Sequence, residues 1–222
     1  MMDILEITSE MIDETGAYVG DADVSNWHGH IHIAANLGWV KFSALLAKGR
    51  INAQTGSGIK AGDGIEAGWG IEAGEGIEAG EGIKAGWGIE AGWGIEAGWG
   101  IEAGEGIKAG WGIEAGEGIE AGEGIKAGWG IKAGWGIKAG WGIEAGEGIK
   151  AGEGIKAGWG IEAGFSISAK RIITPMRIFA GLCNWRLPSP QERQVCAEKI
   201  EGEVAYGEAV ILKPQEHSDG PR

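Results

Sequence analysis

The sequence predicts an all-β protein built as a parallel β-solenoid, and three observations support this prediction. Between residues 59 and 165 a six-residue unit, Ile-[Glu/Lys]-Ala-Gly-[Trp/Glu/Asp]-Gly, recurs eighteen times without a break in spacing, the last copy ending at Phe165. A short uninterrupted period is typical of solenoids, whose units are too small to fold alone and must stack on their neighbours. Ile and Ala never vary within the unit, whereas the second and fifth positions do.

The varying positions indicate which side chains face water. The second position holds Glu in ten copies and Lys in eight, and the fifth holds Trp nine times and Glu or Asp eight times. A position that accepts either charge lies outside, because an unpaired buried charge is costly. In Ile-x-Ala the first and third side chains therefore point inward and the second points outward, as in a three-residue strand. Gly-x-Gly forms the corner, where glycine permits positive φ and close backbone approach.

The composition excludes several classes of protein. The 46 glycines are not at every third residue and there are only five prolines, so collagen is excluded. The regular Ile, Ala and Trp argue against a disordered linker. The two cysteines form no disulfide framework, and no apolar stretch is long enough to span a membrane. The N-terminus resembles no secretory leader, which favours a cytoplasmic protein.

The number of units in one turn can be two or three. Stepping by twelve residues from Lys60 to Lys156, Lys and Glu alternate without a fault, whereas stepping by eighteen gives no order. Opposite charges stacked in one column stabilise in-register strands. We therefore expect a flat, two-sided coil of twelve residues, although duplication of a 24-residue unit would give the same alternation.

A weaker six-residue periodicity outside the strict repeat sets the expected domain boundaries. We expect an acidic N-terminal cap at 1–38, the solenoid at 39–182 with the strict repeats at 59–165, and a C-terminal cap at 183–222. Caps are needed because the ends of a solenoid expose unpaired strand edges.

The C-terminal cap has a helix-start pattern. Ser189 as N-cap, Pro190 in the first turn and Glu192 three residues after Ser189 predict a short helix. Two short strands are expected at 203–206 and 209–212, followed by a mobile tail from Lys213.

The sequence Trp27-His28-Gly29-His30-Ile31-His32 is the one candidate metal site. On a strand the three imidazoles of His28, His30 and His32 would point the same way and could share one zinc ion. The alternative is three imidazoles of a cap strand without a metal. We expect no other cofactor and no catalytic residue, because the carboxylates lie in exposed ladders rather than in a pocket that separates their pKa values.

The tryptophans at the fifth position are the candidate interface residues. If they face outward they form apolar stripes larger than an ordinary monomer surface carries, and Trp is favoured at protein interfaces. Alternatively, each indole lies flat on a glycine of the next coil and serves stability alone. The residues are Trp69, Trp87, Trp93, Trp99, Trp111, Trp129, Trp135, Trp141 and Trp159.

The repeat block resembles β-solenoid repeat proteins, a group that includes hexapeptide-repeat acyltransferases and the polymer-forming bactofilins. The resemblance implies architecture only. The acyltransferase pattern has a small residue two places before the aliphatic one, where this chain has Trp69 before Ile71. That departure favours the two-sided coil, and no catalytic residue is carried over.

Three functions remain open from the sequence. The first is a non-enzymatic binding or scaffold protein that forms a homo-oligomer or docks a protein partner through its Trp stripes. The second is an acidic inhibitor or nucleic-acid mimic of the phage or plasmid type, which the net charge of −13 permits and which would block a host enzyme. The third is a small metalloenzyme using the histidine cluster. Direct binding to nucleic acid or to an anionic membrane is not expected, because neither suits an acidic surface.

Overall fold

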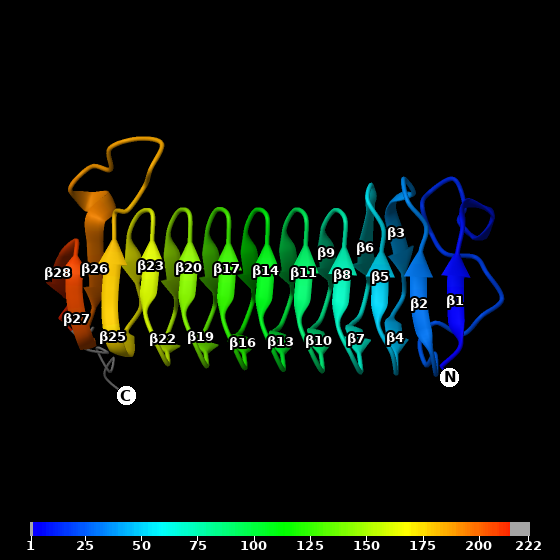
Figure 1. Ribbon diagram of the computed structural model, residues 1–222, viewed down its shortest axis with the longest axis horizontal. Helices are drawn as coiled ribbons and strands as arrows, with labels where there is room; N and C mark the ends of the chain where they lie inside the picture. The colour runs from blue at the N-terminus through cyan, green and yellow to red at the C-terminus, as the bar shows by residue number, and fades with distance from the viewer. Residues whose placement is uncertain (1, 214–222) are drawn as a thin grey trace, which may run out of the picture.

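The computed structural model describes residues 2–213, which form one long three-sided prism of stacked strands (Figure 1). The strands pair in parallel from one end to the other, and the only helical pieces among the described residues are two 3₁₀ turns, η1 (Ser9–Met11) and η2 (Gln191–Arg193). The predicted parallel β-solenoid is therefore confirmed. Three ladders of strands form the three faces, and the short segments between ladders form the corners.

Each face is one ladder of in-register strands. Face 1 contains β1 (Ile4–Ile7), β2 (His30–Ile33), β5 (Ile51–Ala53), β8 (Ile71–Ala73), β11 (Ile89–Ala91), β14 (Ile107–Ala109), β17 (Ile125–Ala127), β20 (Ile143–Ala145) and β23 (Ile161–Ala163). Face 2 contains β4 (Leu45–Ala47), β7 (Ile65–Ala67), β10 (Ile83–Ala85), β13 (Ile101–Ala103), β16 (Ile119–Ala121), β19 (Gly136–Ala139) and β22 (Gly154–Ala157). Face 3 contains β3 (Gly38–Phe42), β6 (Ser57–Ala61), β9 (Ile77–Ala79), β12 (Ile95–Ala97), β15 (Ile113–Ala115), β18 (Ile131–Ala133), β21 (Ile149–Ala151), β24 (Ile167–Ser168), β26 (Gln194–Ala197) and β28 (Glu208–Ile211).

Two long strands close the prism at its C-terminal end. β25 (Arg171–Ala180) pairs through its first half with β22 on face 2 and through its second half with β23 on face 1. β27 (Lys199–Tyr206) follows β25 around the same corner. The ten strands of face 3, at about 4.8 Å per step, make the prism about 43 Å long.

One turn of the solenoid contains eighteen residues, because Ile83 pairs with Ile65 on one side and with Ile101 on the other. The expected twelve-residue, two-sided coil is therefore wrong. The alternating charges do not share a column: the strand neighbours of Lys84 are Glu66 and Glu102, which lie eighteen residues away. The alternation at twelve residues therefore does not come from stacking within one column.

The corner geometry explains the three-sided coil. A chain that reverses direction within a few residues needs left-handed backbone, as in two-residue hairpin turns. No glycine between residues 59 and 165 has a positive φ; within residues 2–213 the glycines that do are Gly16, Gly38, Gly56, Gly181, Gly202 and Gly207. Each Gly-x-Gly segment therefore turns the chain only part of the way, and three corners are needed to close one coil. The repeat glycines do not use the positive φ that glycine permits.

Ile and Ala of every unit point into one continuous core. Each repeat isoleucine is at most 1% exposed and each repeat alanine at most 4%. The residue between them is exposed in most strands, as in β14 with its buried, exposed, buried pattern. The predicted orientation of the unit is confirmed, and the buried polar side chains of the described residues, Ser57 and Thr174, lie outside these Ile and Ala positions.

From Gly68 onward, the first glycine of each unit is required by close backbone contact. A Cβ atom on Gly104 would lie 2.0 Å from the carbonyl oxygen of Gly86 in the preceding coil, and the same contact recurs along the repeat. The second glycine is less crowded, since a Cβ on Gly106 would meet only the Gly124 oxygen at 3.3 Å. The expected close approach of backbones is therefore confirmed for the first glycine of each pair and not for the second.

Parallel pairing continues into both segments expected to be caps. At the N-terminal end β1 adds a strand to β2, and residues between them cover the end of the prism. At the C-terminal end β27 and β28 match the strands expected on either side of Gly207. The expected mobile tail lies almost wholly outside the described residues.

The expected C-terminal helix is replaced by the single 3₁₀ turn η2. Part of its predicted start is present, because the backbone N–H of Ser189 donates to Glu192 Oε2 at 2.9 Å. The chain then continues as strand β26, whose Val195 pairs with Ile167. Adding a strand to face 3 buries Val195 completely, and this ladder pairing takes precedence over the local helix start.

We expect the two glycines of one corner to respond differently to substitution. Gly104→Ala should destabilise the protein by about 3 kcal/mol, because the added methyl overlaps backbone that cannot move without breaking the ladder. Gly106→Ala, the matched control, should cost less than about 1 kcal/mol. Thermal or urea unfolding followed by circular dichroism measures both, and equal losses would contradict the backbone-contact explanation.

Candidate functional site

The outer surface of the repeat consists of six columns of side chains, which border three axial grooves. Each groove lies between a corner column, formed by the fifth residues of the units, and a strand column, formed by the second residues. Glycine and isoleucine of each unit form its floor. The grooves are open, and glycine and isoleucine form the floor along most of their length; Trp39 covers the floor of groove 3 at its N-terminal end.

The three grooves differ in their residues. Groove 1, on face 1, has the corner column Trp69, Trp87, Glu105, Glu123, Trp141, Trp159 and the strand column Glu72, Glu90, Lys108, Lys126, Glu144, Glu162. Groove 2, on face 2, has Asp63, Glu81, Trp99, Glu117, Trp135, Glu153 opposite Glu66, Lys84, Glu102, Glu120, Lys138, Lys156. Groove 3, on face 3, has the corner column Glu75, Trp93, Trp111, Trp129, Glu147, Phe165. Its strand column begins one coil earlier and contains Lys60, Glu78, Glu96, Glu114, Lys132, Lys150, so that Trp93 lies across from Glu96.

All nine corner tryptophans are exposed, from 37% at Trp69 to 66% at Trp135. Where tryptophans are neighbours in one column, their rings stack in parallel. The centroids of Trp93 and Trp111 lie 5.4 Å apart, as do those of Trp111 and Trp129. The pairs Trp69–Trp87 and Trp141–Trp159 stack at 5.0 and 5.7 Å. Stacking therefore restricts these indoles while each stays largely exposed to solvent.

The corner indoles do not lie on the second glycines of the grooves. No Trp of another coil comes within 4 Å of the Cβ positions built on Gly88, Gly94 or Gly106. Trp39, outside the strict repeat, does take that position, because its ring contacts the sites above Gly58 and Gly76. The corner tryptophans therefore do not cover the second glycines of the next coil, and the alternative in which they do so is not supported.

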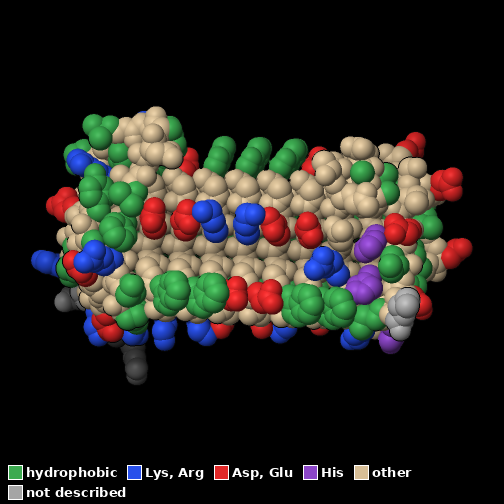
Figure 2. Space-filling view, viewed as in Figure 1, with side chains coloured by type: hydrophobic (Ala, Val, Ile, Leu, Met, Phe, Trp, Pro, Cys, Tyr) green, Lys and Arg blue, Asp and Glu red, His purple; other side chains and the backbone are tan. Residues whose placement is uncertain are grey.

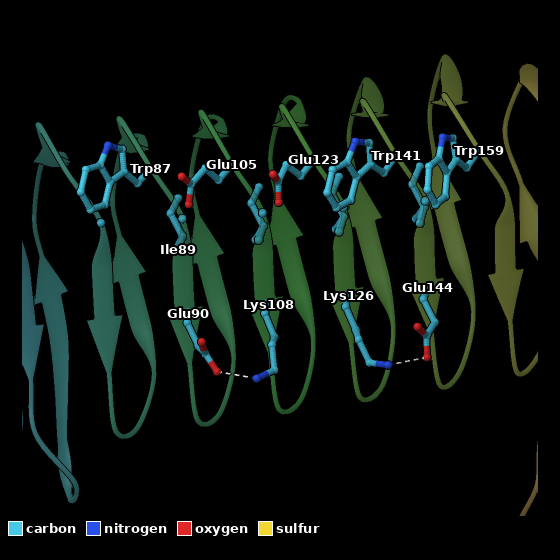
Figure 3. Close-up of a pocket in the computed structure, with 18 of the residues that line it drawn as sticks. Trp87, Ile89, Glu90, Glu105, Lys108, Glu123, Lys126, Trp141, Glu144 and Trp159 are labelled. Carbon is cyan, nitrogen blue, oxygen red and sulfur yellow. Dashed lines mark hydrogen bonds and ion pairs between the residues drawn. The ribbon is translucent and has the colours of Figure 1, made fainter.

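Charges within a strand column form exposed ion pairs between neighbouring coils. In groove 1, Lys108 Nζ lies 2.5 Å from Glu90 Oε1, and Lys126 Nζ lies 2.7 Å from Glu144 Oε1 (Figure 3). Hydrogen bonding to Glu90 raises the pKa of Lys108. Figure 2 shows this column as a row in which two lysines separate two pairs of glutamates. Exposed pairs of this kind contribute little stability each.

The histidines of the N-terminal segment have three different partners. His28 precedes β2, and its Nδ1 lies 3.1 Å from the carbonyl oxygen of Asn26. His30 Nδ1 accepts the backbone N–H of Arg50 at 2.9 Å, and His32 Nδ1 lies 3.2 Å from Glu6. Within residues 2–213 no three His, Cys, Asp or Glu side chains gather as metal ligands would. The geometry therefore gives the zinc hypothesis no support.

A surface loop between β25 and β26 adds aromatic and cationic groups beyond groove 3. The Trp185 ring packs edge-on against Phe165, with centroids 5.8 Å apart. The Arg186 guanidinium lies 4.2 Å from the Phe165 centroid and also forms an ion pair with Glu192. Sequence reasoning missed this cluster; the single Phe in a corner position otherwise held by Trp, Glu or Asp was the available clue.

Comparison of the chain with protein-family models, with curated proteins and with solved structures finds no match. Among the described residues, no helix has the length and hydrophobicity required to cross a lipid bilayer.

The Arg186–Glu192 pair should persist into strongly acidic solution. Hydrogen bonds from Arg186 and from the Ser189 backbone lower the pKa of Glu192 to about 2. Because the folded pKa is depressed, the pair stabilises the loop above the ordinary pKa of Glu and is lost as the pH falls through about 2. Carboxyl ¹³C titration by NMR should give that midpoint for Glu192. In Arg186→Gln it should rise toward 4.5; a midpoint near 4.5 in the unchanged protein would contradict the pairing.

Proposed function

We propose that this protein is a non-enzymatic β-solenoid scaffold that docks protein, either a second copy or another chain, through its corner tryptophan columns. The observation that supports this proposal most strongly is the exposure of all nine repeat tryptophans on the edges of the prism. Trp is the residue type most enriched at the centres of protein interfaces. A row of them on one monomer is more apolar surface than solubility favours.

The backbone of the corner is the same whether its side chain is Trp or Glu. The corner N–H of Trp135 bonds to the carbonyl of Glu117 at 2.9 Å, and that of Trp111 bonds to the carbonyl of Trp93 at 3.0 Å. Eight of the eighteen corners are occupied by Glu or Asp. The fold therefore does not depend on an indole at any one corner, which leaves binding as the better reason for the tryptophans.

The corner tryptophans are also pre-organised for binding. Each corner is fixed by hydrogen bonds to the coil below and above, and stacked rings restrict one another. A partner that binds such a column loses little side-chain entropy, since the rotamers are already restricted.

The acidic-mimic alternative is supported by net charge alone. Within residues 59–165 eight lysines are distributed over all three strand columns, and six of them pair with glutamates. A surface that imitates nucleic acid should present mainly one sign of charge. The metalloenzyme alternative has no ligand cluster to support it among the described residues.

Replacing five corner tryptophans by Glu should abolish docking and leave the fold intact, because Glu already occupies equivalent corners. The changes are W87E, W93E, W111E, W129E and W141E. A control variant with the same added negative charge carries K60Q, K84Q, K138Q, K150Q and K156Q. Light scattering measures self-association against the 23.0 kDa monomer, and affinity capture from the native host measures docking of another chain.

We expect the unchanged protein and the lysine control to associate or capture the same partner, and the tryptophan variant to do neither. Loss of the β-sheet circular dichroism spectrum in the tryptophan variant would assign the columns to stability instead. A folded tryptophan variant that still associates and captures as before would refute docking through the columns.

A further inference from the structure

Groove 3 differs from the other two because one of its walls has a continuous aromatic stretch and the opposite wall a continuous acidic stretch. One wall has the longest run of stacked tryptophans, Trp93, Trp111 and Trp129. The opposite wall has the longest run of glutamates, Glu78, Glu96 and Glu114, which stack in register. Groove 1 has Trp only in pairs, and groove 2 alternates Trp with Glu.

The glutamate run has too few cations of its own. Lys60 pairs with Glu78 at 2.6 Å, and Lys132 pairs with Glu114. Glu96 lies between two like charges, one coil above and one below, and has no ion-pair partner among the described residues. Neighbouring like charges in a ladder are destabilising, and a cation supplied from outside would relieve the repulsion.

The width of the groove limits the occupant to an extended chain. Trp93 and Glu96, on opposite walls, are three residues apart, so their Cα atoms are at most about 11 Å apart. An α-helix with its side chains is about 10–12 Å across and would fill that whole width, leaving no space for the Trp and Glu side chains of the walls. The floor offers only Gly94 and Ile95 between those two residues, which allows a backbone to lie close.

The axial spacing favours a polyproline II segment over a β-strand. Glu78 and Glu114 are two coils apart, or about 9.6 Å. A polyproline II chain repeats every three residues, about 9.3 Å, whereas alternate residues of a strand repeat every 6.6–6.8 Å. Aromatic-lined grooves are a known binding mode for polyproline II segments.

We propose that groove 3 docks a basic, proline-rich segment of a partner protein in the polyproline II conformation. Arg or Lys side chains three residues apart lie opposite Glu78 and Glu114, one on each side of the unpaired Glu96, and the prolines pack on Trp93, Trp111 and Trp129. This inference rests on the proposed docking function and names the chemistry of the partner.

The probe is a fluorescent peptide of four Arg-Pro-Pro repeats, titrated with the full-length protein and followed by anisotropy. Two peptides serve as controls: one of four Glu-Pro-Pro repeats, and one with the same four arginines placed together before the eight prolines. We expect binding of the first peptide that weakens as salt is added, no binding of the acidic peptide, and weaker binding of the clustered one.

Matched variants locate the site. Glu96→Gln should weaken binding about fivefold, and Trp111→Ala about tenfold. Glu162→Gln in groove 1 and Trp135→Ala in groove 2 occupy the same positions of the unit and should change affinity less than about twofold. Circular dichroism melting checks that all four variants fold.

Three results would overturn the inference: no binding of the Arg-Pro-Pro peptide at low salt, equal losses in the groove 3 and control variants, or equal affinity for the clustered peptide. The docking proposal is tested separately. If the peptide fails but the five-tryptophan variant still loses association or capture, the partner chemistry is wrong and docking through the columns stands.

Discussion

The contact between the first glycine of each unit and the carbonyl oxygen of the coil below is the constraint on which the structure depends. At Gly104 and its equivalents the two backbones are so close that no Cβ fits. Backbone hydrogen bonds such as Gly104 N–H to the Ala85 carbonyl hold each corner at the spacing of the strand ladder, and that spacing leaves no room for a Cβ. Because every coil meets the same requirement, the prism is straight and uniform, and its outer positions are free to vary without affecting the core.

That separation of core from surface explains why so much of the fold could be read from the sequence. Ile and Ala are predicted to lie inside because they do not vary, and the charged second position is predicted to lie outside because it accepts both signs; the burial of Ile107 and the exposure of Lys108 agree. The parallel solenoid follows from the period alone. The two strands that flank Gly207 were also predictable, because this glycine separates two segments of residues that favour β-strands.

Coil size was not predictable from the charge pattern, for a physical reason. Exposed ion pairs such as Lys84–Glu102 contribute too little to select a register, so a perfect alternation can arise without any stacking. The backbone angles of the corner determine how many residues form one coil, and the sequence Gly-x-Gly is compatible with both a tight reversal and an open bend. The histidines show a similar limit: the spacing of His28, His30 and His32 is that of a strand face, but β2 begins only at His30.

The uniformity of the coils has a consequence for the relative orientation of the two ends. Every unit of the repeat can occupy any of the three faces, so removing or adding three units changes only the height of the prism. Removing one unit shortens it and also rotates everything after that point by a third of a turn. The C-terminal loop bearing Trp185 would then project over a different groove, and every corner beyond the deletion would join a new column. Unit number thus sets both the length of this rod and the angular phase between its termini.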